Sequence, residues 1–493
     1  MSAFHNALFQ LALPEIILAV AALAVLSVDL LVLRTRAIRV RAAVATALAS
    51  GGCALAMVRI FFAAHSANVM DGMLLATPLI QLVQVALLLM AILTLYVAVD
   101  STFSEHVGEF ILIVLLATAG MMFMVASHNV LVIFVSLELV SLALYVMTGF
   151  DKRSPRSAEA ALKYFLFGGM SAGFLLYGFS LLYGLSNSTN LSQIALAVQG
   201  RPLNPLLIIA LVTTVIGFGF KVAAAPLHFW APDAYEGAPL PAAAFIASSS
   251  KIASFFTFYT VMTLGFAGVE GVAWPHGSAG WVPMLALVAA ASMILGNVAA
   301  LAQSSVRRLL AYSAVGHAGY MLLAIVSHSQ TSLAALIYYV ITYALTTLGA
   351  FAAVGVVQEA TGGDQLNDFD GLSRRSPVLS ACLFIFLLSL AGIPPLAGFF
   401  GKFYLFFSAL QSAPRPLGLI WLVALAIAMS AVSLYYYLQV LKRVYVTPPA
   451  ADAQKICVPW LRMAVVVSLA AATLLLGAAP HILLRWILLA GVQ

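Results

Sequence analysis

Long apolar runs follow one another along almost the whole chain, and they constrain its fold more than any other feature. The 493 residues are 63% hydrophobic and 8% charged, whereas soluble domains carry roughly 25% charged residues. A helix of about 20 apolar residues crosses the hydrocarbon core of a bilayer, and the runs leave no room for a soluble domain. The composition therefore predicts an all-α polytopic membrane protein.

Hydropathy divides the chain into fourteen expected spans. They cover residues 11–33, 42–64, 74–99, 109–126, 130–150, 158–184, 203–225, 240–267, 281–303, 306–327, 331–358, 376–411 (broken), 417–446 and 460–480. The segment 190–200 is too short to span and is expected at the membrane interface.

The positions of the basic residues predict the topology. Fifteen of the 23 Lys and Arg residues lie in alternate loops, on one side of the expected bundle. Those in the opposite loops are Arg59, Arg201, Arg415 and Arg485, and those inside spans are Lys163, Lys221, Lys251 and Lys402. Cytoplasmic loops are enriched in Lys and Arg, so both termini are expected on the non-cytoplasmic side, with no cleaved signal peptide.

A weak internal repeat relates the two halves of the chain. Residues 160–164 (AALKY) resemble residues 334–338 (AALIY), and Pro226 has a counterpart in Pro395 inside a second interrupted apolar run. The offset is five spans, so the copies are inverted, as in many transporters. We expect an N-terminal three-helix segment (1–105), a first repeat (106–268), a second repeat (281–446) and a C-terminal helix (458–493).

The stretch 217–251 indicates the centre of an ion pathway. Pro226 interrupts an apolar helix between Lys221 and Lys251, and His228 lies in the polar passage that follows the break. Freed backbone groups at membrane depth are tolerated only where protein or water satisfies them, and intramembrane charges mark functional sites. The alternative is that Lys221 snorkels to the interface and Pro226 only ends a helix.

Further ionisable residues fall within the apolar runs. Glu138 lies mid-span and needs a partner or a proton; Lys163 or Lys221 could pair with it, and a purely structural ion pair is the alternative. Lys402 follows the second break. Asp29 and Glu15 are expected near the interface, at the ends of the first span.

Lysine is the cation suited to carrying protons in this setting. Burial and neighbouring charges can bring its titration toward neutral pH, whereas arginine stays charged. Lys221, Lys251 and Lys402 are therefore the expected proton carriers, with the serines preceding Lys251 and His228 and His317 as possible intermediates. For His317, proton relay and plain packing both remain open, and a haem is disfavoured because it needs a second axial histidine.

Other site classes find no support in the sequence. The three cysteines are scattered singly, so neither a disulfide framework nor a thiolate metal cluster is indicated. No phosphate-binding loop or dinucleotide fingerprint occurs. The net charge of +6 reflects membrane topology, and nucleic acid is not an expected partner.

Two motifs resemble a known family. The stretch GFKVAAAPLHFWAPDAYEGAP followed by SSSK, together with LSLAGIPPLAGFFGKFYLF, is similar to subunit N of proton-translocating NADH:quinone oxidoreductase (respiratory complex I), one of its antiporter-like membrane subunits. The resemblance covers essentially the whole chain. It implies fourteen helices with two inverted five-helix repeats, a Glu138–Lys221 pair, a central Lys251, Lys402 in the second half-channel and a supporting Lys163.

The resemblance also implies partners and a location. NADH, FMN, iron–sulfur clusters and quinone are expected in partner subunits, with no cofactor or metal bound by this chain. The chain would work in a hetero-oligomer with other membrane-arm subunits, in a bacterial inner membrane, as a proton-pumping translocase subunit. An autonomous sodium/proton antiporter and a structural membrane scaffold are the alternatives.

Overall fold

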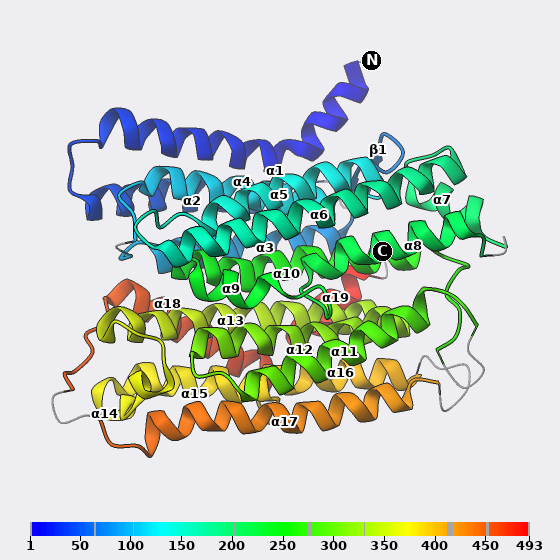
Figure 1. The fold of residues 1–493 in the computed structure, drawn as a ribbon. Helices are drawn as coiled ribbons and strands as arrows, with labels where there is room; N and C mark the ends of the chain where they lie inside the picture. The colour runs from blue at the N-terminus through cyan, green and yellow to red at the C-terminus, as the bar shows by residue number, and fades with distance from the viewer. Residues whose placement is uncertain are drawn as a thin grey trace.

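The computed structural model describes residues 2–63, 66–101, 103–200, 203–273, 278–329, 331–411, 418–449 and 453–491. Arg201 and Arg415, which entered the topology argument, lie outside these ranges. The described chain is almost entirely helical, and its helices run nearly parallel to one another (Figure 1).

The helices follow the expected spans closely. The N-terminal part contains α1 (Ser2–Ser27) with η1 (Val28–Val32), α2 (Ile38–Phe61) and α3 (Pro78–Ala98). The region expected to form the first repeat contains α4 (Val107–Val125), α5 (Val130–Thr148), α6 (Pro155–Ser186), α7 (Leu191–Val198), α8 (Pro205–Lys221), α9 (Trp230–Gly237) and α10 (Leu240–Thr260) with η2 (Val261–Gly265).

The second half continues in the same manner. It contains α11 (Trp281–Leu301), α12 (Val306–Ser327), α13 (Ser332–Thr361), η3 (Leu366–Phe369), α14 (Leu372–Arg375), α15 (Pro377–Ala391), α16 (Ala397–Gln411), α17 (Ile420–Tyr445), α18 (Trp460–Ala478) and α19 (His481–Gly491). Within the described ranges, eleven helices are long and apolar enough to cross a membrane. Adding α8, α10 and the α15–α16 pair gives the fourteen predicted spans.

The segment 190–200, expected to be too short to span, contains the eight-residue helix α7 (Leu191–Val198). Two details differ from the sequence-based expectation. A small antiparallel hairpin joins β1 (Ala67–Val69) to β2 (Leu74–Ala76) between α2 and α3. The C-terminal region holds two helices instead of one, because the chain turns at Pro480, which fixes φ and donates no backbone hydrogen bond.

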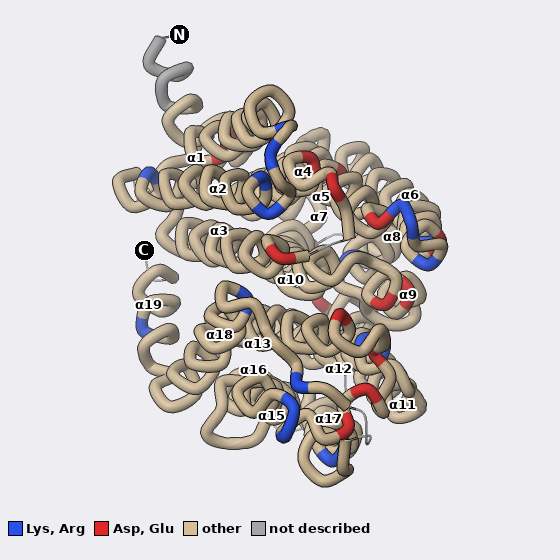
Figure 2. The backbone as a smooth tube through the Cα atoms, turned by 90° about the vertical axis from the view of Figure 1, so that its left-hand side faces the viewer, with Lys and Arg blue, Asp and Glu red and all other residues tan. Residues whose placement is uncertain are grey.

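Most charged residues gather at one end of the bundle, which we call the basic end. It carries the α1–α2, α5–α6, α11–α12 and α17–α18 connections with their Lys and Arg residues, together with α9, and Figure 2 looks onto it. Both chain termini lie toward the opposite, right-hand side in Figure 1. This arrangement agrees with the alternating loop charge seen in the sequence.

The centre of the bundle is formed by α10, α12 and α13. Every residue from Leu240 to Tyr259 of α10 is buried, and α10 packs along α13, joining the first repeat to the second. Because α10 faces protein on all sides, it can be rich in Ala and Ser without exposing polar groups to lipid. Helix α9 also contacts α13, through Tyr235 and Phe351. We call the surface where α9 and α10 meet α13 the seam.

Two buried carboxylates of the first span have hydrogen-bond partners on neighbouring helices. Asp29 is fully buried and forms two hydrogen bonds with Arg41, at 2.7 and 2.8 Å. Glu15 is also buried and accepts a hydrogen bond from Gln84 of α3. The interfacial positions expected for these two residues stay a prediction.

A buried arginine connects the last span to distant parts of the chain. Arg462 of α18 is completely buried and donates to Glu359, at the end of α13, at 2.5 Å. It also donates to Ser101 in the α3–α4 connection at 3.2 Å.

Glycines allow α11 and α12 to approach closely. A Cβ atom added at Gly296 would lie 2.4 Å from the backbone nitrogen of Gly316, and one added at Gly319 would lie 2.6 Å from Cγ of Met293. Small residues at such contacts let helix backbones pack tightly within membranes.

We expect Gly296→Ala to lower the thermal stability of the protein, because overpacking a tight contact costs about 1–3 kcal/mol. Gly173→Ala is the matched control, since a Cβ there meets no atom within 4 Å. Thermal unfolding in detergent measures both variants. Equal midpoints for the two would contradict the close packing of α11 on α12.

Candidate proton-conducting site

The first helix break leaves backbone groups that neighbouring side chains satisfy. Helix α8 ends at Lys221, and Ala223 adopts a left-handed φ of 54° before Pro226. The ammonium of Lys251 donates to the Val222 carbonyl at 2.6 Å, and the backbone N–H of Ala225 donates to Ser292 at 2.8 Å. The break is therefore an ordered element within the protein core.

Lys221 points into the protein from the end of α8. It is 8% exposed, and its ammonium donates to the hydroxyl of Ser141 on α5 at 2.5 Å and to that of Tyr145 at 3.4 Å. These contacts rule out snorkelling as the account of its position in this structure.

Glu138 lies one helical turn before Ser141, on the same helix as the Lys221 contacts. It interacts electrostatically with Lys221, but within the described ranges the two form no ion pair closer than 4 Å, and one carboxylate oxygen of Glu138 has no hydrogen-bond partner. The Ser141 hydroxyl, and not the Glu138 carboxylate, is hydrogen-bonded to the Lys221 ammonium. The structure thus brings Glu138 and Lys221 into one cluster, with Ser141 as the group that contacts Lys221.

The second break repeats this arrangement with a different lysine. Helix α15 ends at Ala391, the chain turns through Gly392 (φ 88°), and α16 begins at Ala397. The ammonium of Lys402 donates to the carbonyls of Leu390 and Ala391, both at 3.0 Å, and to Ser430 of α17 at 2.8 Å. In both breaks, a buried lysine binds the carbonyls that the interrupted helix leaves free.

Polar side chains surround Lys402 and His317 in the second half. The Lys402 ammonium lies 5.0 Å from the centre of the Tyr320 ring. The Tyr320 hydroxyl accepts a hydrogen bond from Asn297 at 3.2 Å, and the Tyr436 hydroxyl donates to Asn297 at 3.0 Å. These groups form a buried polar cluster within an otherwise apolar region.

His317 is held by two tyrosines. Its Nδ1 lies 2.6 Å from the Tyr339 hydroxyl, and its Nε2 lies 3.3 Å from the Tyr437 hydroxyl. The Tyr437 hydroxyl also contacts Ser313. Both ring nitrogens therefore have hydrogen-bond partners, an arrangement that suits proton relay and leaves neither nitrogen free for an axial metal bond.

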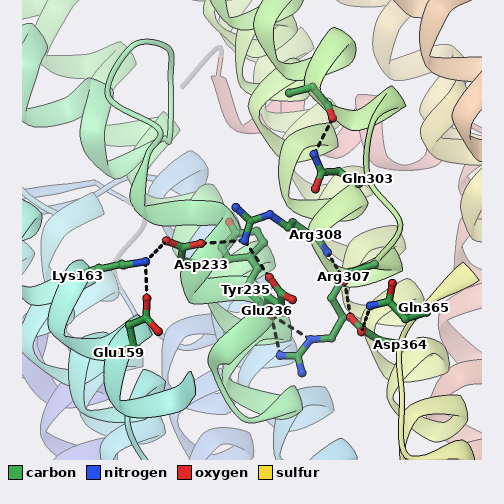
Figure 3. Close-up of polar contacts among 12 residues, drawn as sticks. Glu159, Lys163, Asp233, Tyr235, Glu236, Gln303, Arg307, Arg308, Asp364 and Gln365 are labelled. Carbon is green, nitrogen blue, oxygen red and sulfur yellow. Dashed lines mark hydrogen bonds and ion pairs between the residues drawn. The ribbon is translucent and has the colours of Figure 1, made fainter. Parts of the chain in front are cut away.

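Lys163 belongs to an ion-pair cluster at the basic end (Figure 3). It binds Glu159 at 2.7 Å and Asp233 at 2.8 Å, and Arg308 binds Asp233 at 2.8 Å and Glu236 at 2.9 Å. Burial alone would raise the pKa of Asp233, but the hydrogen bonds from Lys163 and Arg308 hold it below its usual value. The Lys163 side chain is 40% exposed, so it lies apart from the buried lysines.

His228 lies in the passage between α8 and α9. It is buried, its ring lies 5.1 Å from that of Phe229 and 6.3 Å from that of Tyr312, and its Nδ1 has no hydrogen-bond partner among the described residues. No contact joins it directly to the predicted lysines within those ranges.

Several groups at the site were missed by the sequence reasoning. They are Ser141, Tyr145, Asn297, Tyr320, Ser430 and Arg308. Ser141 could have been found, because it lies one turn from Glu138 on the same helix face. Ser430 and Asn297 come from helices distant in sequence, and no local pattern links them to Lys402.

Comparison with known proteins places the chain in a family. The family model described as "NADH:quinone oxidoreductase/Mrp antiporter, TM" matches residues 127–430. The NADH-quinone oxidoreductase subunit N 2 of Acidobacterium capsulatum is 53% identical over 98% of this chain and 99% of its own length. Subunit N 1 of Roseiflexus castenholzii is 40% identical over 80% of this chain and 75% of its own.

Solved structures agree with this relationship. A chain of respiratory complex I from Thermus thermophilus superposes with a TM-score of 0.78 and 35% identity, covering 96% of this chain and 98% of that chain. A chain of the Mrp complex from Dietzia superposes with a TM-score of 0.82 at 20% identity, covering 98% and 97%, which shows a common fold. The chain therefore belongs to the NADH:quinone oxidoreductase/Mrp antiporter family of membrane subunits and, within it, to the subunit N group of NADH:quinone oxidoreductase.

Proposed function

We propose that this chain is a proton-translocating subunit of the membrane arm of an NADH:quinone oxidoreductase. One observation carries the proposal: Lys251 and Lys402 are buried, and their ammonium groups bind neutral carbonyl and hydroxyl oxygens at the two helix breaks. A lysine held in this way can release its proton without leaving an unpaired carboxylate beside it. Each break thus supplies a group that can alternate between two protonation states.

The remaining roles follow from the two clusters. Lys221 accepts or releases a proton next to Ser141, and Glu138 modulates this step through its charge. His317, hydrogen-bonded between two tyrosine hydroxyls, is placed to relay protons toward Lys402. Lys163 acts outside the buried path, in the ion-pair cluster at the basic end.

The energy for transport comes from partner subunits. Moving one charge against 100 mV costs about 2.3 kcal/mol, and the redox cofactors, namely NADH, FMN, iron–sulfur clusters and quinone, are expected in the subunits that carry out electron transfer. The chain would lie in the bacterial inner membrane, with its basic end toward the cytoplasm and both termini on the opposite side.

Replacing buried lysines by arginine separates proton transport from structural support. Arginine keeps the positive charge but does not release its proton. We expect Lys221→Arg and Lys402→Arg to lower NADH-driven proton pumping at least about tenfold, equivalent to ~1.4 kcal/mol in the barrier, in complexes that still assemble. Inverted membrane vesicles with a pH-sensitive dye measure pumping, and native gels measure assembly.

Lys442→Arg provides the matched control, because Lys442 is exposed near the end of α17. It should pump and assemble like the unmodified protein. If the two buried variants also pumped at the full rate, the lysines would be structural and the scaffold hypothesis would replace this one.

The antiporter alternative makes a different prediction about sodium. We expect NADH-driven proton pumping by the intact complex in proteoliposomes to be the same with sodium or choline as the cation, because the cores of both clusters are lysine ammonium groups, which already carry positive charge. Labelled sodium uptake coupled to proton efflux would instead support sodium/proton exchange.

A further inference from the structure

A polar pocket opens at the basic end, where the main parts of the bundle meet. Its volume is about 430 Å³, and its lining includes Asp151, Arg156, Glu236, Arg307, Gln358 and Glu359. These residues come from the α5–α6 connection, from the start of α6, from α9, and from α12 and α13. The pocket therefore lies directly over the seam.

Tyr235 of α9 immediately precedes Glu236, which lines this pocket. Its backbone carbonyl accepts hydrogen bonds from Arg307 at 2.6 and 3.0 Å (Figure 3), and Arg307 lines the pocket. The Tyr235 side chain is completely buried, and its hydroxyl has no hydrogen-bond partner among the described residues. Leaving a buried hydroxyl unsatisfied costs about 1–3 kcal/mol, so this group needs an explanation.

The face of α13 that Tyr235 contacts runs from the pocket toward the buried polar cluster around His317 and Lys402. Gly355 lines the pocket, and Phe351, one turn further in, packs against the Tyr235 ring with centroids 5.8 Å apart. Tyr343 lies two turns beyond Phe351 on the same face of α13. The Tyr343 ring lies 5.0 Å from that of His317.

Aromatic rings pack against the Tyr235 side chain. The Trp230 ring lies 6.0 Å and the Phe351 ring 5.8 Å from the Tyr235 ring, between centroids. Apolar constrictions hold back water in channels. The Tyr235 hydroxyl is a buried polar group within this aromatic cluster.

We propose that Tyr235 is a relay residue through which protons pass from the pocket at the basic end to the Tyr343–His317 side of the seam. This inference rests on the proposed function and adds the route by which protons reach the buried cluster. A phenol is both donor and acceptor: its oxygen takes a proton from water on the pocket side while its own proton passes to water or hydroxyl on the other. The phenol is unchanged after each transfer.

Tyr235→Phe tests the relay directly, because it removes only the hydroxyl. Since that hydroxyl makes no hydrogen bond with the described residues, we expect neither the thermal stability nor the assembly of the complex to fall. We expect NADH-driven proton pumping in vesicles to fall at least about tenfold, the lower range of what a positioned proton-transfer group contributes.

Tyr338→Phe is the matched control on α13. Its hydroxyl is also buried but donates to the Leu476 carbonyl at 2.8 Å, away from the seam. This variant should lose stability and keep pumping, the reverse of Tyr235→Phe. Full pumping by Tyr235→Phe, alongside loss in Lys402→Arg, would overturn the relay and leave the proposed function standing. Full pumping by Lys221→Arg and Lys402→Arg would overturn both.

Discussion

The structure depends on satisfying backbone groups that two interrupted helices leave unpaired inside the membrane. An unsatisfied carbonyl in hydrocarbon costs several kcal/mol, and a buried ammonium is similarly costly. Here the unpaired carbonyls and the buried ammonium groups satisfy one another. Lys251 binds the carbonyl of Val222, and Lys402 binds those of Leu390 and Ala391. Removing the proton from either lysine weakens the support of its break, which couples protonation to local backbone structure.

Much of this architecture is visible in the sequence. The length and apolarity of the runs predicted the fourteen spans, and interior prolines predicted both breaks. Lysine within apolar sequence marked Lys221, Lys251 and Lys402 as buried groups, because a charge at membrane depth is costly without a function. These features are local, so a single chain read in order is sufficient to find them.

The contacts between distant helices could not be predicted in the same way. Lys221 meets Ser141 across two helices, and Lys402 meets Ser430 across α16 and α17. Serine is common in membrane helices. The spacing of serines along a helix does not show which of them bind a lysine and which only pack. Lys163 lies in an apolar run, which suggested that it is buried. In the structure it is partly exposed at the basic end, where it forms ion pairs with Asp233 and Glu159.

The hydrogen bonds that Arg462 forms with Glu359 and Ser101 have a consequence for the biogenesis of the protein. This arginine is the third residue of α18, the last long helix. It binds Glu359, which lies 103 residues earlier in the chain, and Ser101, which lies 361 residues earlier. During translation, Glu359 emerges long before its cation does. The ribosome must therefore deliver nearly the entire polypeptide before this corner can close, which makes its closure a late checkpoint in membrane insertion.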